Sequence, residues 1–284
     1  MSFFVYNNLM KKKIIVSLLV VFMTFALLLG GNFIVGSCFV PVQNEQEDDD
    51  KNRDDEIDTK TSGYWSDSGN YATSFTQSCR NGVYNIATAG ELALMACILN
   101  EVDGVADGYD ASMKSPTQIN IIKDIDLSEH YWTPISNSIK NCKINGGGNT
   151  ILGLRLLGEN GTYSNYQYSV GLFRYFNNVN VQDLNIEDAN ITSSEPRYNT
   201  NYAFLVGQAT STSSNTISNV SVSGTIDFMA QSKHYLRVGG IAGNTYSYNF
   251  ENCSADVTMS YSGIGDKTSF GGMVGLFEVT HGTN

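Results

Sequence analysis

Val238-Gly-Gly-Ile-Ala-Gly243 is one of four copies of a short motif in the second half of the chain. The other copies are Ser169–Arg174, Tyr202–Gly207 and Phe270–Gly275. The last residues of successive copies lie 33, 36 and 32 residues apart. A period of about 20 to 50 residues is typical of a solenoid, in which each coil buries its apolar face against its neighbours. We therefore expect this region to form stacked coils.

A second element repeats with apolar residues at its first, fourth and sixth positions. Its copies are Ile139–Ile144, Val181–Ile186, Ile217–Val222 and Phe250–Ala255, with Asn141, Asp183, Asn219 and Asn252 in third place. Strict strand alternation would place the apolar residues two apart, so the third residue is an insertion. Asn and Asp tolerate left-handed backbone, which turns a strand. We expect these four residues to stack as a ladder at one corner; the alternative is that Asn is simply common in loops.

The apolar runs favour strands over helices. They are short, separated by Gly, Asn, Ser and Thr, and have mostly two-residue spacing. The clearest runs are 144–156, 179–191, 220–228 and 257–259. Three short strands and their turns fit one period if a loop in each coil bulges outward, at 159–168, 193–202, 230–236 and 263–269. The chain is thus predicted to be all-β, a parallel β-helix over 63–284 with the glycine-rich repeats at 169–284.

One helix is expected before the coils, at 88–103. Thr88 and Glu91 have the spacing of a capping box, in which Glu91 reaches back to the Thr88 amide. Leu92, Met95 and Leu99 follow at helical spacing. An amphipathic helix in this place would cap the open end of the solenoid, which otherwise exposes apolar side chains and unpaired strand edges.

Several segments before the glycine-rich copies follow one another in an order that is typical of a known protein family. Tyr84–Ala93, Ile121–Ser128, Tyr131–Ile135 and Asn145–Leu154 precede the glycine-rich copies. Together they resemble exported bacterial β-helix proteins that carry GLUG motifs, including adhesin-like surface proteins and the repeat regions of M26-type immunoglobulin A peptidases. The resemblance covers about 63–284 and implies a right-handed parallel β-helix at the cell surface, with no shared active site. Arg174 departs from the motif, because the other copies end in Gly.

The N-terminus predicts export. Lys11, Lys12 and Lys13 precede an apolar run from Ile14 that reaches Leu29 or Val35, and positive charge before an apolar core is the secretory pattern. Three fates of 1–37 stay open: lipidation at Cys38 in a lipobox-like sequence, retention of the apolar run as a membrane anchor, or cleavage near Gly36 with release.

A dense run of acidic residues marks a tether between the leader and the domain. Within the expected tether, 38–62, residues 45–58 contain nine acids against Lys51 and Arg53, and such a self-repelling run is typical of a flexible linker. The domain that follows is also acidic, with 19 acids and 12 bases over 59–284. A nucleic-acid partner is therefore not expected.

No residue pattern points to chemistry. His130, His234 and His281 lack a second ligand at metal spacing. Asp124 and Asp126 share a strand face and could pair as acid and base. A solvated strand edge is the favoured explanation, because no Arg, Lys or His companion recurs nearby. Cys79–Cys97 is the one disulfide considered. Aromatic residues in the expected loops could bind sugars or proteins, or could pack against the coil; they are Tyr64, Trp65, Tyr71, Tyr163, Tyr166, Tyr168, Tyr246 and Tyr248. We expect no catalytic residue, no metal and no cofactor.

These patterns predict a cell-surface scaffold that binds an extracellular glycan or protein, attached to the membrane by its N-terminus. The alternative is a noncatalytic repeat segment of a larger secreted peptidase or glycan-active enzyme. The last repeat is followed by no closing element before Asn284, which predicts either that the chain is a piece of a longer protein or that its end pairs with another chain.

Overall fold

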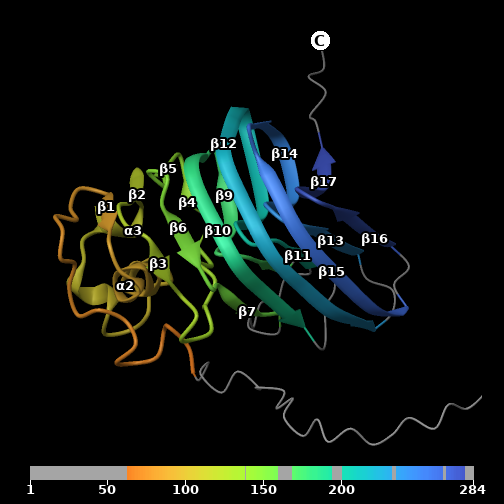
Figure 1. Cartoon of the computed structure of the whole chain (residues 1–284). Coiled ribbons are helices and arrows are strands. Elements are labelled where there is room, and N and C mark those ends of the chain that lie inside the picture. Colours follow the sequence, from red (N-terminus) through yellow and green to blue (C-terminus); the bar gives the residue numbers. More distant parts are fainter. Residues whose placement is uncertain are drawn as a thin grey trace, which may run out of the picture. The chain divides into compact units, whose positions relative to one another are not determined.

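The computed structural model describes residues 63–137, 139–158, 168–193, 200–231, 235–264 and 267–278. They form a parallel β-solenoid of about five turns, which confirms the predicted fold class (Figure 1). They belong to one compact unit, Asp55–Asn284. Because this unit contains the whole hydrophobic core, we expect it to fold by itself. The leader, the tether and most of the four expected bulges lie outside the described residues.

Two parallel sheets build the coils. The larger sheet follows the order β1 (Val83–Ile86), β2 (Gln118–Ile121), β5 (Lys143–Asn145), β10 (Asn180–Ser193), β12 (Val206–Gln231), β14 (Ala242–Glu251) and β17 (Val274–Glu278). It also contains β3 (Ile125–Asp126), β4 (Ile139–Lys140), β6 (Thr150–Leu152), β7 (Arg155–Leu157), β9 (Phe173–Asn177) and β15 (Ser254–Ile264). The smaller sheet has β16 (Lys267–Gly271), β13 (Tyr235–Gly239), β11 (Thr200–Tyr202) and β8 (Tyr168–Val170) in that order. The long strands β10 and β12 bend around corners, so one sheet supplies several faces.

Asn and Asp turn the strands at a corner that we call the second corner. Asp183, Asn219 and Asn252 have φ of 54°, 51° and 52°. Asn219 Nδ2 donates to Asp183 Oδ1 at 2.8 Å, and Asn252 Nδ2 donates to Asn219 Oδ1 at 3.3 Å. These three residues therefore form a hydrogen-bonded ladder along the solenoid.

Asn141 does not belong to that ladder, so its predicted place is wrong. The Asn141 amide donates to Asn177 O, and Asn178 Nδ2 donates to Asn141 Oδ1 at 3.3 Å. Asn141, Asn178 and Ser247 have φ of 51°, 55° and 56° and mark a separate corner, which we call the first corner. The position equivalent to Asp183 in the earlier coil is Gly146, whose added Cβ would lie 2.2 Å from Asp183 O.

The final glycine of the repeated motif lies against the preceding coil. An added Cβ would lie 2.5 Å from Ser169 Cβ at Gly207, and 2.8 Å from Asn201 Cβ at Gly243. Both neighbours belong to the smaller-sheet strand of the coil before. Arg174 escapes this constraint because β8 is the edge strand of that sheet. Its guanidinium lies 5.5 Å from the Tyr168 ring centroid.

The helix α2 (Ala89–Leu99) closes the N-terminal end of the stack (Figure 1). It ends earlier than the predicted 103, and it is not amphipathic, because every residue from Glu91 to Leu99 is buried. Preceding and following loops, with η1 (Ala106–Gly108) and α3 (Ala111–Lys114), belong to the same end. Thr88 Oγ1 accepts from the Glu91 amide at 3.2 Å, as an N-cap residue does.

The Glu91 carboxylate joins the helix to its surroundings. Glu91 Oε1 accepts from Thr76 N at 2.5 Å and from Thr76 Oγ1 at 2.6 Å, and Oε2 accepts from Ala87 N at 2.7 Å. The carboxylate thus binds Thr76 and Ala87 in addition to the predicted Thr88 amide. Burial raises the pKa of Glu91, but hydrogen bonds from Thr76, Ala87 and Thr88 outweigh it and hold the pKa below its ordinary value.

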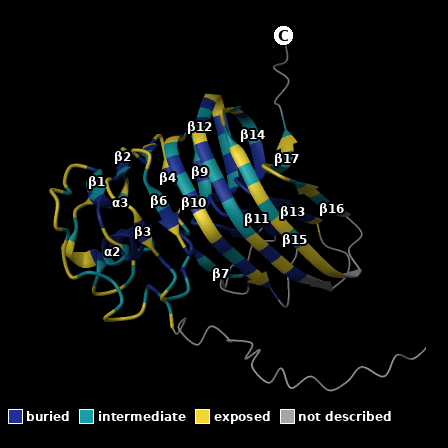
Figure 2. Cartoon of the chain, in the orientation of Figure 1, coloured by how far each residue is buried: buried dark blue, intermediate teal, exposed yellow. Residues whose placement is uncertain are grey.

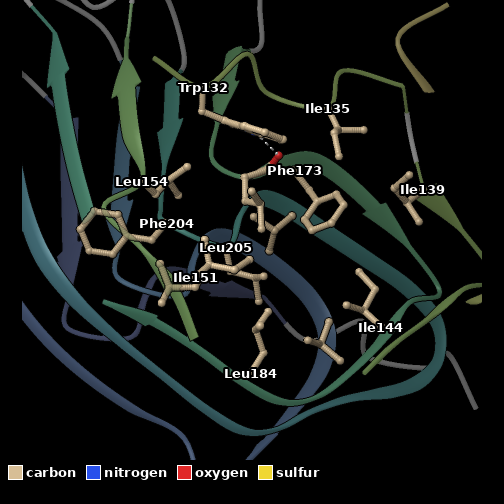
Figure 3. Packing of buried hydrophobic residues seen from close by; sticks show 14 of the residues in the cluster. Trp132, Ile135, Ile139, Ile144, Ile151, Leu154, Phe173, Leu184, Phe204 and Leu205 are labelled. Atoms are coloured by element: carbon tan, nitrogen blue, oxygen red, sulfur yellow. Dashed lines mark hydrogen bonds between the residues drawn. The ribbon is translucent and has the colours of Figure 1, made fainter. Parts of the chain in front are cut away.

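Side chains from successive coils fill a continuous interior (Figure 3). Leu184 and Ile151 come from neighbouring coils, and Trp132 lies over Phe173 with its Nε1 donating to Leu172 O at 3.0 Å. Tyr248 contributes a longer link, because its Oη accepts from Val179 N at 3.0 Å. Asn215 of the intervening coil pairs with Tyr248 in the sheet, so this hydrogen bond spans two coils.

The C-terminal coil is less covered than those before it. Exposed and intermediate residues dominate β15, β16 and β17 (Figure 2). Phe270 and Phe277 are 47% and 49% exposed. Val238, which pairs with Phe270 in the coil before, is fully buried. The apolar side chains of this last described coil therefore contact protein on one side only.

Candidate functional site

A polar groove runs across four neighbouring strands, β2, β5, β10 and β12, between the two corners. Outward side chains there align in two rows across the strands. The first row is Gln118, Lys143, Asn180 and Thr216, and the second is Asn120, Asn145, Gln182 and Ser218. Inward neighbours such as Ile144 and Val181 are buried, so strand alternation presents only polar groups.

These side chains enclose a real concavity. A cavity of about 310 Å³ is lined by Gln118, Lys143, Ile144, Asn145, Asn180, Val181, Gln182, Thr216 and Ser218. Its volume is at the lower end of the range of small-molecule sites. Since adjacent strands lie about 4.8 Å apart, the groove repeats its functional groups at about that spacing.

Several groove amides are positioned by hydrogen bonds. Asn180 Oδ1 accepts from Thr216 N at 2.9 Å, and Asn145 Oδ1 accepts from Gly147 N at 2.9 Å. Gln182 Nε2 donates to Asp183 Oδ2 at 2.9 Å, which ties the groove to the ladder of the second corner. The side chains therefore enter binding with part of their conformational freedom already removed, which lowers its entropic cost.

A second cavity lies across the first corner, between the coil and the end of α2. It measures about 300 Å³ and is lined by Leu99, Glu101, Lys114, Ser115, Pro116, Asn137, Ile139 and Lys140. Leu99, Pro116 and Ile139 are buried, so the accessible lining is mainly polar and charged. We call it the lysine cavity, because Lys114 and Lys140 line it from different elements.

The two carboxylates considered for catalysis are occupied by local backbone. Asp124 Oδ1 accepts from Thr150 N at 2.8 Å, and Asp126 Oδ1 accepts from Ser128 N at 2.9 Å. Both residues are exposed. These contacts fit the alternative that they are solvated residues at a strand edge.

No metal site emerges within the described ranges, where no three His, Cys, Asp or Glu side chains group as ligands would. The ring of His130 packs edge-on against Trp65, with centroids 4.8 Å apart. His234 and His281 lie outside the described residues. Asp110 caps α3 through the Ser112 and Met113 amides, so it has a structural role.

The cysteines of the domain are free thiols. Cys79 and Cys97 are not joined, so the disulfide considered from sequence is wrong. Burial raises the pKa of Cys97 to about 11 and that of Cys142 to about 12. At neutral pH both thiols are therefore protonated and poor nucleophiles.

The loop aromatics expected to be exposed are mostly not available to a ligand. Trp65, Tyr168 and Tyr248 are buried, and Tyr64 and Tyr246 are partly buried. Tyr163 and Tyr166 lie outside the described residues. The buried aromatic residues pack against the coil, which is the alternative that the sequence left open.

The polar groove was missed by sequence reasoning. A signal was present in the alternation of buried and polar residues at 143–145, 180–182 and 216–218. Alternation alone places polar groups outward on any solenoid face, however, and it does not reveal which face is concave.

Comparisons of the chain with protein-family models, with curated proteins and with solved structures find no match. Within the ranges that the structure describes, no helix has the length and apolar character needed to span a bilayer. Cys38 and the apolar run before it lie outside those ranges.

Proposed function

We propose that this chain is an exported binding scaffold of the cell surface, and that the polar groove holds an extended polar ligand without transforming it. The observation that supports this most is the groove itself. Four coils align two rows of amide, hydroxyl and ammonium groups there, over a cavity of about 310 Å³.

The chemistry of the groove suits binding rather than reaction. Its lining has hydrogen-bond donors and acceptors, but no carboxylate, imidazole or thiol that could act itself or activate Lys143, Thr216 or Ser218. General acid–base or nucleophilic catalysis usually needs such a group within reach of the substrate. An array of amides instead offers paired donors and acceptors to hydroxyl or amide groups of a ligand.

Variants of two groove residues, exposed Gln182 and partly buried Ser218, test this proposal in the unit Asp55–Asn284. Gln182→Ala combined with Ser218→Ala removes polar atoms from adjacent strands, whereas Thr258→Ala changes an exposed residue of β15 outside the groove. On an array of glycans and matrix proteins, we expect a ligand whose binding falls roughly threefold to thirtyfold in the groove variant. The Thr258 variant should bind normally. A ligand bound equally by both variants would place binding elsewhere.

We also propose that residues 1–37 direct export and hold the product at the membrane, as in the GLUG-bearing surface proteins that the chain resembles. The charged and apolar pattern of the leader supports this. Fractionation of cells that express wild type and Cys38→Ala tests it. Release of the variant alone indicates lipidation, and retention of both indicates an uncut anchor. Wild-type protein found wholly in the medium would refute membrane attachment.

A further inference from the structure

The three lysines beside the polar groove carry an inference about its ligand, and it rests on the function proposed above. Lys143 lines the groove, whereas Lys114 and Lys140 line the lysine cavity. The two cavities are neighbours, because Lys140 and Lys143 flank the first corner at Asn141. The paired strands β2 and β5 bring Gln118 beside Lys143, just beyond Pro116 of the lysine cavity.

These ammonium groups are available to a ligand. The ion pair seen among the described residues joins Arg155 to Asp188, at 2.9 Å, and involves none of the three lysines. Lys140 and Lys143 are exposed and Lys114 is partly buried. One acid, Glu101, lines the lysine cavity with them. Three positive charges against one negative charge therefore stand out in a domain with more acids than bases.

We propose that Lys114, Lys140 and Lys143 bind the carboxylate or sulfate groups of an anionic polysaccharide that continues into the polar groove. The Leu99 carbonyl at the end of α2 already accepts from Asn137 Nδ2 at 2.5 Å, so this oxygen does not face the anion unpaired.

A polysaccharide fits these surfaces better than a protein partner. Protein interfaces usually concentrate their binding energy in buried aromatic or arginine anchors. Neither lining contains an aromatic residue or an arginine. A chain of hydroxyl groups with periodic negative charge matches rows of amides that end in lysines, because charge-assisted hydrogen bonds supply affinity where the charges meet.

The probes are three soluble polymers with one extended backbone: hydroxyethyl cellulose, carboxymethyl cellulose and cellulose sulfate. Affinity electrophoresis of the unit Asp55–Asn284 through gels that contain each polymer gives the dissociation constants. We expect either or both charged polymers to bind at least about tenfold more tightly than the neutral one at low salt. The two charged arms tell a carboxylate ligand from a sulfate ligand. Raising the ionic strength from about 0.05 M to about 0.3 M should reduce the difference.

Matched variants connect that preference to the lysines. The triple change Lys114→Gln, Lys140→Gln and Lys143→Gln should remove the preference for charged polymer, whereas Lys123→Gln, an exposed lysine outside both cavities, should keep it. The triple change to Arg keeps the charges and should keep the preference. Glu101→Gln should strengthen binding, since it removes the one negative charge, and a merely structural role of the lysines would not produce that increase.

The outcomes separate this inference from the proposed function. Equal binding of neutral and charged polymers, or a preference that survives the triple Gln change, would overturn the lysine assignment and leave the groove as a binding site. Binding of acidic proteins but of no polysaccharide would overturn the choice of ligand class. Failure of the groove to bind any ligand on the array would overturn both.

Discussion

Glu91→Gln should destabilise the domain strongly, although it changes a carboxylate into its nearest neutral equivalent. Glu91 is 1% exposed and accepts from Thr76 N, Thr76 Oγ1 and Ala87 N. A glutamine oxygen can keep the hydrogen bonds from Thr76. Its NH₂ group would then face the Ala87 amide, which leaves a buried donor unpaired.

The magnitude follows from these contacts. An unpaired buried amide costs about 1–3 kcal/mol. Loss of a negative charge in the first turn of α2 costs about 0.3–1 kcal/mol more. We therefore expect the free energy of unfolding of Asp55–Asn284 to fall by about 1–4 kcal/mol, measured by urea denaturation at neutral pH. Glu129→Gln, at an exposed position, is the matched control and should change the stability little.

The pH dependence tests the cause. The folded-state pKa of Glu91 lies below its ordinary value of 4.5, because hydrogen bonds outweigh burial. The stability that the carboxylate contributes is therefore complete above about pH 4.5 and is lost as the pH falls through the lower folded-state pKa. The difference between wild type and Glu91→Gln should shrink over that acidic range. A variant as stable as wild type at pH 7, or a difference that stays constant in acid, would refute this reasoning.

Three further predictions concern the coils. Asn219→Ala should lower the free energy of unfolding by about 1–2 kcal/mol, because alanine disfavours left-handed backbone. Thermal unfolding should show a smaller loss for Asn219→Gly, and equal losses would contradict the backbone argument. Gly243→Ala should cost about 1–3 kcal/mol by overpacking, whereas Gly272→Ala, with open space around its Cβ position, should be nearly neutral in the same denaturation assay. Hydrogen exchange should be faster for the amides of β17 than for those of β12, since the last described coil is covered on one side; equal protection would show that the coil is closed in solution.

The fold was predictable because residues that pack between coils recur at a regular interval in the sequence. A coil that must stack on its neighbours repeats its apolar positions and its tight contacts, as Gly207 and Gly243 do. The exception at Arg174 has a local reason, since β8 is the first strand of the smaller sheet among the described residues. That reason depends on where the sheet begins, which the motif itself does not contain.

The position of Asn141 was mispredicted because one pattern serves two corners. Apolar residues at the first, fourth and sixth positions describe Ile139–Ile144, but they also describe Phe176–Val181, where Asn178 is third. The strand pairing aligns these two segments with each other. When two corners of a coil share the same apolar pattern, the pattern alone cannot tell to which corner a segment belongs. The strand register decides this.

The candidate site was less accessible to sequence analysis than the fold. Lys114, Lys140 and Lys143 come from a short helix and two strands, and only the pairing of β2 with β5 brings their surroundings together. The helix α2 was predicted with a polar side, yet it is enclosed on all sides. Both features are tertiary, because they depend on which loops fold over the end of the stack.

The hydrogen bond from Val179 N to Tyr248 Oη has a consequence for how the solenoid unfolds. Repeat proteins are usually treated as chains of nearest-neighbour interfaces, so that terminal repeats are lost one by one. Here β12 carries extra residues between Thr210 and Asn215, and Tyr248 of the next coil reaches the Val179 amide two coils away. Burial raises the pKa of this phenol to about 12, so it stays protonated at physiological pH. Detaching the coil of Tyr248 would leave a buried amide in an earlier coil without its acceptor. Unfolding from this end should therefore be cooperative over at least three coils rather than stepwise.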